Sequence, residues 1–341
     1  MAISTVAFSP KQFKIAIAEQ DAFGTIQGAG TYHTLDVDSV GSPSLNPVQS
    51  LDVKTGSRVL QQADFFQSVT TSVKEISISG TATTNALDLL LENIIGEAEG
   101  SASGVYNFAS NAGTQSVGTG ATSQAGTLLS VIIISPHTGT ENSNLAFKDC
   151  VVTNLTLNGD MGTEGGRIKF SATLQTGSVV DDLTDAATAI ATAYTGTENY
   201  VMTDWSDPVY RQLVGVNELV MNSFSLTLDN PASFAGGTSA GYEVVVRAGE
   251  FSATLDASVK YDDKTENMFE VFNNQTSGSD TGTTLLNNDD TLSDGTFGIH
   301  MPESVLTNVS FNEGDIMMLD LSIKAVGTAV NSSTSLVVVS C

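Results

Sequence analysis

Apolar and polar residues alternate along much of the chain, which is the pattern of β-strands with one buried face. The alternation runs through segments in both halves of the sequence, at Val73–Ile78, Cys150–Leu157, Ile168–Leu174, Phe224–Leu228, Phe251–Leu255, Val305–Phe311 and Leu319–Ala325. A continuous apolar run, Leu128–Ile134, has the length of a strand buried on both faces. The pattern therefore predicts a mainly β fold.

Two segments follow helical spacing instead. Apolar residues between Leu87 and Ile95 recur at i, i+3, i+4, i+7 and i+8, after threonines that can cap a helix and before Gly96. In the second half, Asp263–Glu266 has the spacing of a capping box, and apolar residues between Met268 and Phe272 share one helical face. One short helix is expected in each half.

The two halves repeat the same order of elements. Val152–Asn158 aligns with Leu306–Asn312, and a second strand follows each, Ile168–Ala172 and Leu319–Ile323, with a turn that this alignment makes three residues longer in the first half. A strand, a capped helix and a polar insert precede the hairpin in both halves. We interpret this order as an internal duplication.

The duplication predicts two tandem small β-sandwich or barrel domains, each with one flanking α-helix. The expected first domain covers residues 37–180 and the second covers residues 211–330, with a linker at 181–210. Residues 1–36 are expected to form an N-terminal arm, and residues 331–341 a C-terminal tail. The polar insert Glu97–Gly126 is expected to be a mobile loop or a ragged hairpin.

Composition narrows the possible functions. The net charge is −25, from 38 acidic and 13 basic residues, which disfavours a protein that grips nucleic acid through lysine and arginine. The acidity is heaviest in residues 216–341, which hold 17 acidic and 4 basic residues. No apolar run is long enough to cross a membrane, and no secretory signal opens the chain. Cys150 and Cys341 are expected to be free thiols.

No motif for catalysis, metal binding or cofactor binding stands out. His33, His137 and His300 lie far apart, and the chain has neither a nucleophile-elbow motif nor a phosphate-binding loop. The acidic segment Asn287–Asp290 suggests a calcium loop. If the loop begins at Asp290, its third position is Leu292, which cannot bind the ion. We expect a protein that is not an enzyme and that needs no cofactor.

The opening segment Lys14–Thr25 is similar to the start of many siphophage tail tube proteins, and the hairpins Cys150–Gly177 and Val305–Gly327 resemble their closing strands. The resemblance implies a small β-sandwich or barrel with one flanking helix, whose subunits join edge to edge in rings that stack into a conduit for phage DNA. Single-domain members form rings of six, so a chain with two such domains is expected to form a trimeric, pseudo-hexameric ring.

The same resemblance implies a location in the phage tail of the virion, after synthesis in the host cytoplasm. The implied partners are further copies of the chain and other tail proteins such as the tape measure and the terminator, with DNA passing through unbound. Two alternatives stay open: a virion decoration or adhesin-type β-sandwich that binds a ligand, and an enzyme with a site built from scattered carboxylates.

Two further expectations concern surfaces. The segments Val53–Val69 and Ser233–Arg247 occupy equivalent places in the two halves, and both mix apolar with polar residues. We expect them to pack against a neighbouring subunit or ring, through Leu60, Phe65, Phe66, Tyr242, Val244 and Val245. The high net negative charge predicts an acidic lumen that repels phosphate.

Overall fold

The computed structural model describes residues 9, 12–28, 32–35, 37–51, 65–68, 72–95, 104–109, 115–117, 127–135, 144–162, 166–182, 211–217, 219–247, 249–274, 282–286, 297–327 and 335–341. Within these ranges the chain is mainly β, as the alternation predicts, and all of its strand pairs are antiparallel. Leu60, His137 and most of the expected linker lie outside the described residues.

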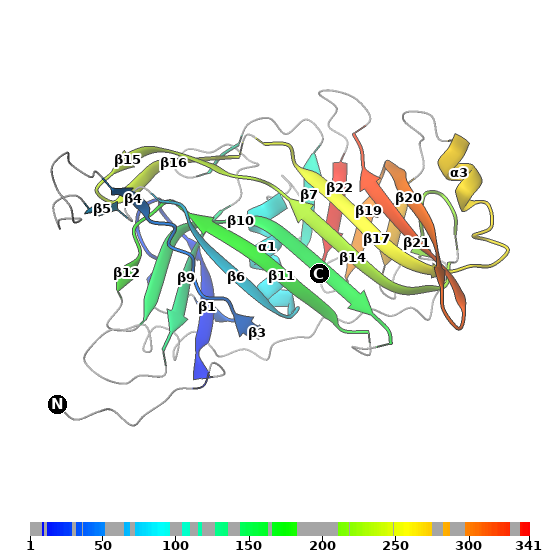
Figure 1. Ribbon diagram of the computed structural model, residues 1–341, viewed down its shortest axis with the longest axis horizontal. Coiled ribbons are helices and arrows are strands. Elements are labelled where there is room, and N and C mark those ends of the chain that lie inside the picture. Colours follow the sequence, from blue (N-terminus) through cyan, green and yellow to red (C-terminus); the bar gives the residue numbers. More distant parts are fainter. Residues whose placement is uncertain are drawn as a thin grey trace.

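A long sheet of eight strands crosses the whole molecule (Figure 1). Its strands lie in the order β3 (Val37–Val40), β6 (Lys74–Thr81), β11 (Ile168–Thr176), β10 (Leu145–Asp160), β14 (Met221–Asp229), β17 (Ser252–Lys260), β21 (Met317–Ala325) and β20 (Ser304–Glu313). Along each central strand, buried apolar residues alternate with polar ones, so one face of the sheet meets the core and the other is polar.

β10 is long enough to serve a second, short sheet. Its first residues pair with β9 (Leu128–Ile134) and β12 (Asp181–Asp182), and β9 pairs with β1 (Lys14–Gln20), which pairs with β2 (His33–Thr34). The register shifts between Phe147 and Cys150, where Asp149 has a φ of 55°. The Asp149 carboxylate accepts hydrogen bonds from Gly24 N and Ser178 Oγ, which fixes this bend.

The N-terminal segment differs from the expected arm. β1 is paired along its full length with β9, and Ile15 and Ile17 are fully buried in the main core. The alternation in Lys14–Gln20 is masked in the sequence because both faces of this strand are covered, so its apolar residues run together.

Three smaller sheets complete the fold. The five-stranded sheet has the order β13 (Arg211–Gln212), β18 (Thr283–Leu286), β19 (Gly298–Met301), β22 (Ser335–Ser340) and β7 (Val105–Ala109). The three-stranded sheet is β15 (Ser233–Thr238), β16 (Gly241–Arg247) and β8 (Gln115–Val117), and the hairpin β4 (Val48–Leu51) with β5 (Phe65–Ser68) stands alone.

Three of these strands overturn expectations from the sequence. β7 and β8 come from the insert Glu97–Gly126, and they pair with β22 and β16 of the second half, not with each other as a hairpin would. β22 comes from the expected C-terminal tail, yet Val337 and Val339 are fully buried between β19 and β7. Both segments gain their structure from distant partners, which local pattern does not reveal.

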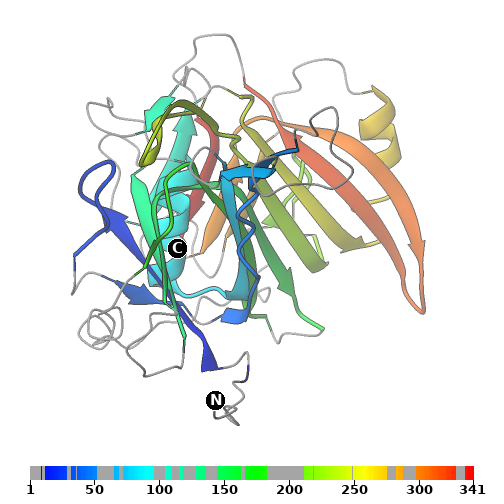
Figure 2. The same ribbon diagram turned by 60° about the vertical axis from the view of Figure 1, so that its left-hand side comes forward.

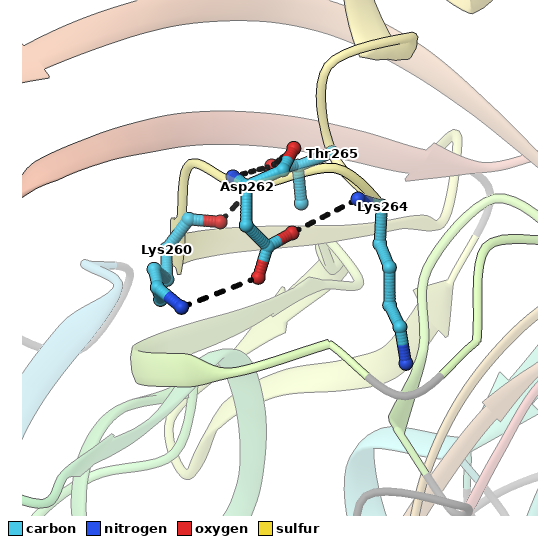
Figure 3. Close-up of polar contacts among 4 residues, drawn as sticks. All are labelled: Lys260, Asp262, Lys264 and Thr265. Carbon is cyan, nitrogen blue, oxygen red and sulfur yellow. Dashed lines mark hydrogen bonds and ion pairs between the residues drawn. The ribbon is translucent and has the colours of Figure 1, made fainter.

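One helix is described in each half, at α1 (Thr84–Ile95) and α3 (Met268–Asn274). Leu87, Leu90, Leu91 and Ile94 of α1 are fully buried against the core, as their spacing predicts. Before α3, the turn closes one residue earlier than the expected capping box. Asp262 N donates to Thr265 Oγ1 at 2.8 Å, Thr265 Oγ1 donates to Lys260 O, and the Asp262 carboxylate accepts from Lys264 N (Figure 3).

The two halves share one sheet and one core. A single cluster of buried apolar residues includes Leu155 and Leu174 of the first half and Leu226 and Leu255 of the second. Figures 1 and 2 show the strands of the second half continuing the row begun by the first, with α3 at the outer margin. The mainly β prediction is confirmed, whereas the shared sheet and core do not separate the chain into two independent sandwiches.

Candidate assembly interface

The two halves meet at a strand pair, β10 with β14. Leu155 lies opposite Leu228 and Leu157 opposite Leu226, and all four side chains are fully buried. Hydrogen bonds cross the junction at both ends, from Asn230 N to Thr153 O at 2.9 Å and from Met161 N to Asn222 O at 3.2 Å. On the polar face, Asn154 Nδ2 donates to Asp229 Oδ1 at 2.5 Å. The junction is therefore a continuous stretch of sheet.

Strand order shows how the halves correspond. The first half runs β3-β6-β11-β10 and the second runs β14-β17-β21-β20. In each half the first two strands are followed in sequence by a helix, and the last two form the closing hairpin. The duplication inferred from the sequence is thus repeated in the topology of the sheet.

Two pairs of β-bulges make this correspondence residue-specific. The β10·β11 ladder shifts register between Val152 and Asn154, and the β20·β21 ladder shifts between Leu306 and Asn308, so Thr153 corresponds to Thr307. The β3·β6 ladder shifts between Val37 and Ser39, and the β14·β17 ladder shifts between Met221 and Ser223. Bulges at matching sites in both halves are hard to obtain without a common origin.

The registers also correct one sequence alignment. Asn158 pairs with Lys169, eleven residues on, whereas the equivalent Asn312 pairs with Met318, six residues on. The first turn is therefore five residues longer, not three, and the second strand of the hairpin was aligned two residues out of register. A slip of two keeps every side chain on its own face, so alternation cannot detect it.

The correspondence identifies the two ends of the long sheet as partners. β14, the first strand of the second half, is joined to β10, the last strand of the first half. Their equivalents are β3 and β20, which lie at opposite margins of the sheet (Figure 1). In the described part of the chain, no strand pairs with the outer edge of either one. Each edge lacks the partner that its equivalent has.

Burial confirms that β20 is uncovered where β10 is covered. Phe311 corresponds to Leu157, and its side chain is 47% exposed while that of Leu157 is 0% exposed. Phe311 lies against Phe269 of α3, with ring centroids 4.7 Å apart, and against Tyr261 at 5.5 Å. An edge strand that carries exposed aromatic residues is a site for pairing with another chain.

The polar face of the long sheet carries short side chains. Serine, threonine and asparagine dominate, and they hydrogen-bond from strand to strand, as between Ser39 and Ser79 at 3.0 Å and between Ser258 Oγ and Asp320 Oδ1 at 2.7 Å. A shallow depression on this face is lined by Asp160, Asp256 and Asp320 among serines and asparagines. The face as described is smooth, polar and mildly acidic.

Charges on this face are mixed, with carboxylates in the majority. The alternation places Glu75, Asp160, Asp229, Asp256 and Asp320 on it, together with Lys169, Lys260 and Lys324. Lys169 Nζ lies 3.0 Å from Asp38 Oδ2. The five carboxylates against three ammonium groups agree in sign with the net charge of the chain, although the imbalance on this face is small.

The structure places five of the six expected contact residues, and Leu60 lies outside the described part. Phe65 and Phe66 of β5 are 44% and 63% exposed, whereas Val245 of β16 is 2% exposed and packs on Leu128 and Val151 of its own chain. Tyr242 packs against Phe234, 6.1 Å between ring centroids, and Val244 stays 44% exposed. The expected residues are therefore split between one docked hairpin and one uncovered hairpin.

Sequence reasoning missed the two edges. Neither β3 with the following Ser42, nor β20 with Phe311, was among the expected contact residues. The signal that could have found them is the duplication itself, because the first and last strands of a tandem repeat must each lack the neighbour that joins the repeats internally.

The remaining chemistry is sparse in the described residues. No group of three or more His, Cys, Asp or Glu side chains is placed to hold a metal there. Both cysteines are free and buried, and burial raises the pKa of the Cys150 thiol well above its usual value. His300 Nδ1 lies 2.9 Å from Thr284 Oγ1, and burial lowers the pKa of its imidazole. Among the described helices, none is long and apolar enough to cross a membrane.

Comparison with known proteins gives no identification. No protein-family model matches the chain, and no curated protein matches it significantly.

Proposed function

We propose that this protein is a structural subunit that assembles into closed rings by pairing β20 of one copy with β3 of the next. The observation that carries the proposal is that these two edges are the equivalents of β10 and β14, which are already paired inside the chain. The internal junction supplies a complete template, with strand direction, register and buried face defined.

The template gives the register between copies. Because Leu157 lies opposite Leu226, we expect Phe311 to lie opposite Ser42 of the neighbouring copy. In the same way, Gly159 lies opposite Phe224, so we expect Glu313 opposite Val40 of that copy. Phe311 and Ser42 are both exposed in the single chain, so pairing would cover them. Contacts of this kind are head-to-tail, and they close into a ring when the rotation per subunit divides the circle.

The polar face is expected to line the lumen. The opposite face is covered by α1, the short sheet and the five-stranded sheet, and this second layer fits only on the outer, wider side of a closed ring (Figures 1 and 2). A lining of short hydroxyl and amide side chains with excess carboxylate would let DNA slide without binding. Together with the resemblance to tail tube proteins, this favours a subunit of a phage tail tube.

Three copies would complete the expected circle. Eight long-sheet strands per chain give twenty-four strands, which at about 4.8 Å spacing make a circumference of about 115 Å and a diameter of about 37 Å before strand tilt widens it. That diameter leaves room for a DNA duplex after side chains are added. Because the halves differ in sequence, the ring would have threefold symmetry with a pseudo-sixfold outline.

The test combines imaging with a register-specific cross-link. Negative-stain microscopy should show rings or tubes, and native mass spectrometry should give three chains of 35.5 kDa per ring. A Ser42→Cys, Phe311→Cys variant should form disulfides between copies, because directly opposite residues lie within disulfide reach. Ser42→Cys with Val309→Cys, which is two residues out of register, should cross-link far less.

Six chains per ring would contradict the trimer. Monomers at every concentration, or a ring with residues 211–327 outside its wall, would contradict the proposal as a whole.

A further inference from the structure

The hairpin β4–β5 and the hairpin β15–β16 are equivalent by register. In β4–β5, Gln49 lies opposite Gln67, and in β15–β16, Ser233 lies opposite Val246. Gly41 and Ser225 are equivalent, and Gln49 follows the first by as many residues as Ser233 follows the second. Ile76 and Leu255 are also equivalent, and Gln67 precedes the first by as many residues as Val246 precedes the second. Under this correspondence Phe65 matches Val244 and Phe66 matches Val245.

The second-half hairpin is docked on the first half of its own chain. Val245 packs with Leu128 and Val151 and is 2% exposed. Tyr242 N donates to Gly177 O at 3.1 Å, and Val179 N donates to Ala240 O at 3.0 Å. β16 also pairs with β8, which belongs to the first half. The hairpin thus crosses the β10·β14 junction and adds contacts that hold the two halves together.

A polar contact strengthens this docking. Arg247 at the end of β16 is buried, and its guanidinium donates to Asn93 O, to Asn93 Oδ1 and to Asn230 O, at 3.0, 3.0 and 2.6 Å. Asn93 lies in the last turn of α1, where unpaired carbonyl groups attract a cation.

In the described part of the chain, no further strand pairs with the first-half hairpin. Phe66, at the position of the buried Val245, is 63% exposed, and Val48 on the paired strand is 50% exposed. The second half offers a matching uncovered site. Val305 corresponds to Val151, and it is half-buried where Val151 is fully buried.

We propose that β4–β5 docks on the second half of the adjacent copy of this chain, as β15–β16 docks on the first half of its own, with Phe66 placed against Val305. The inference rests on the proposed ring, since it uses the same head-to-tail relation between copies. Ser68 stands at the position of Arg247 in this register, so the guanidinium contact is not repeated in the first-half hairpin.

The register separates two neighbouring phenylalanines. Val244 stays 44% exposed although its hairpin is docked, and Phe65, its equivalent, is likewise 44% exposed. Phe66 should become buried between copies while Phe65 stays outside this contact. Phe65 is therefore a matched control on the same strand.

The experiment uses full-length protein with a short bismaleimide cross-linker, to which the buried Cys150 and Cys341 are poorly accessible. Phe66→Cys with Val305→Cys should give cross-linked pairs of chains, and Phe65→Cys with Val305→Cys should give few. Phe66→Ser should weaken ring formation by about tenfold to a hundredfold in concentration, with the unfolding temperature of the monomer unchanged, whereas Phe65→Ser should leave the rings of three intact.

Three results would overturn the inference. If rings form and the Ser42→Cys, Phe311→Cys pair cross-links while Phe66→Cys and Val305→Cys do not, the hairpin contact is wrong and the ring stands. If the Phe66→Cys, Val305→Cys cross-link forms within one chain, the proposed contact between copies is also wrong. If neither pair cross-links and the protein stays monomeric, both the hairpin contact and the proposed ring are wrong.

Discussion

Arg247 joins three separate pieces of the chain from inside the protein. It is 3% exposed, and it links β16 to the end of α1 and to Asn230, which itself donates to Ile94 O at 2.8 Å. Asn93 adds a hydrogen bond from its side chain to Thr127 O, and its Oδ1 accepts from Val152 N. Burial lowers the pKa of the guanidinium to about 9, so it remains cationic at neutral pH.

Replacing this residue should therefore be costly. Arg247→Met keeps much of the volume but leaves the α1 carbonyl of Asn93 and the carbonyl of Asn230 without their donors. We expect a loss of about 2–4 kcal/mol in the free energy of unfolding, measured by denaturant titration. Arg167→Met, at an exposed arginine, should change it by less than about 0.5 kcal/mol. Equal effects of the two substitutions on the free energy of unfolding would show that the buried contacts of Arg247 do not stabilise the fold.

At the scale of elements, β22 is the strand that ties the two halves together on the side away from the polar face. Val339 lies opposite Ile299 of β19 and opposite Tyr106 of β7, so a C-terminal segment bridges the second half and the insert of the first. Cys341 N also donates to Gly104 O at 3.1 Å. The chain end is a structural member of the core.

Shortening the buried side chains of β22 should destabilise the whole protein. Val337→Ala with Val339→Ala should lower the free energy of unfolding by about 2–5 kcal/mol, since both side chains are fully buried. Val338→Ala, at the half-buried position between them, should have a smaller effect in the same thermal or denaturant measurement. A dispensable tail would tolerate all three changes equally.

At the scale of the whole molecule, the proposed ring makes the polar face an enclosed surface. Changing Asp160, Asp256 and Asp320 to Lys should create a basic lumen that binds linear duplex DNA, while the native protein binds little at physiological salt. Because a closed circle cannot thread a ring, circular duplex should bind this variant weakly.

A matched control carries the same charge change on the outer surface. In this control the exposed Asp263, Glu266 and Glu270 near α3 are changed to Lys. The variant should bind linear and circular DNA equally in gel-shift measurements. Equal binding of both DNA forms by the Asp160, Asp256 and Asp320 variant would show that the polar face is not enclosed.

Periodicity in the sequence predicted the local elements well where each is amphipathic on its own. β9 spans the predicted Leu128–Ile134, and α1 buries the leucines and Ile94 that its spacing placed on one face. β10, β11, β20 and β21 contain the predicted hairpin strands. In each case a single buried face imposes the period, so the residues themselves carry the information.

The apolar pattern was enough to predict the β class, the two helices and the repetition of the hairpin, because these depend on which residues must avoid water. The register of the hairpin strands, the pairing of β7, β8 and β22 with the opposite half, and the continuation of one sheet through both halves could be found only in the folded chain. Strand partners are chosen by backbone hydrogen bonds, which every residue except proline offers alike, so sequence pattern does not name them. For the same reason the two unpaired edges, β3 and β20, become visible only when the sheet is assembled.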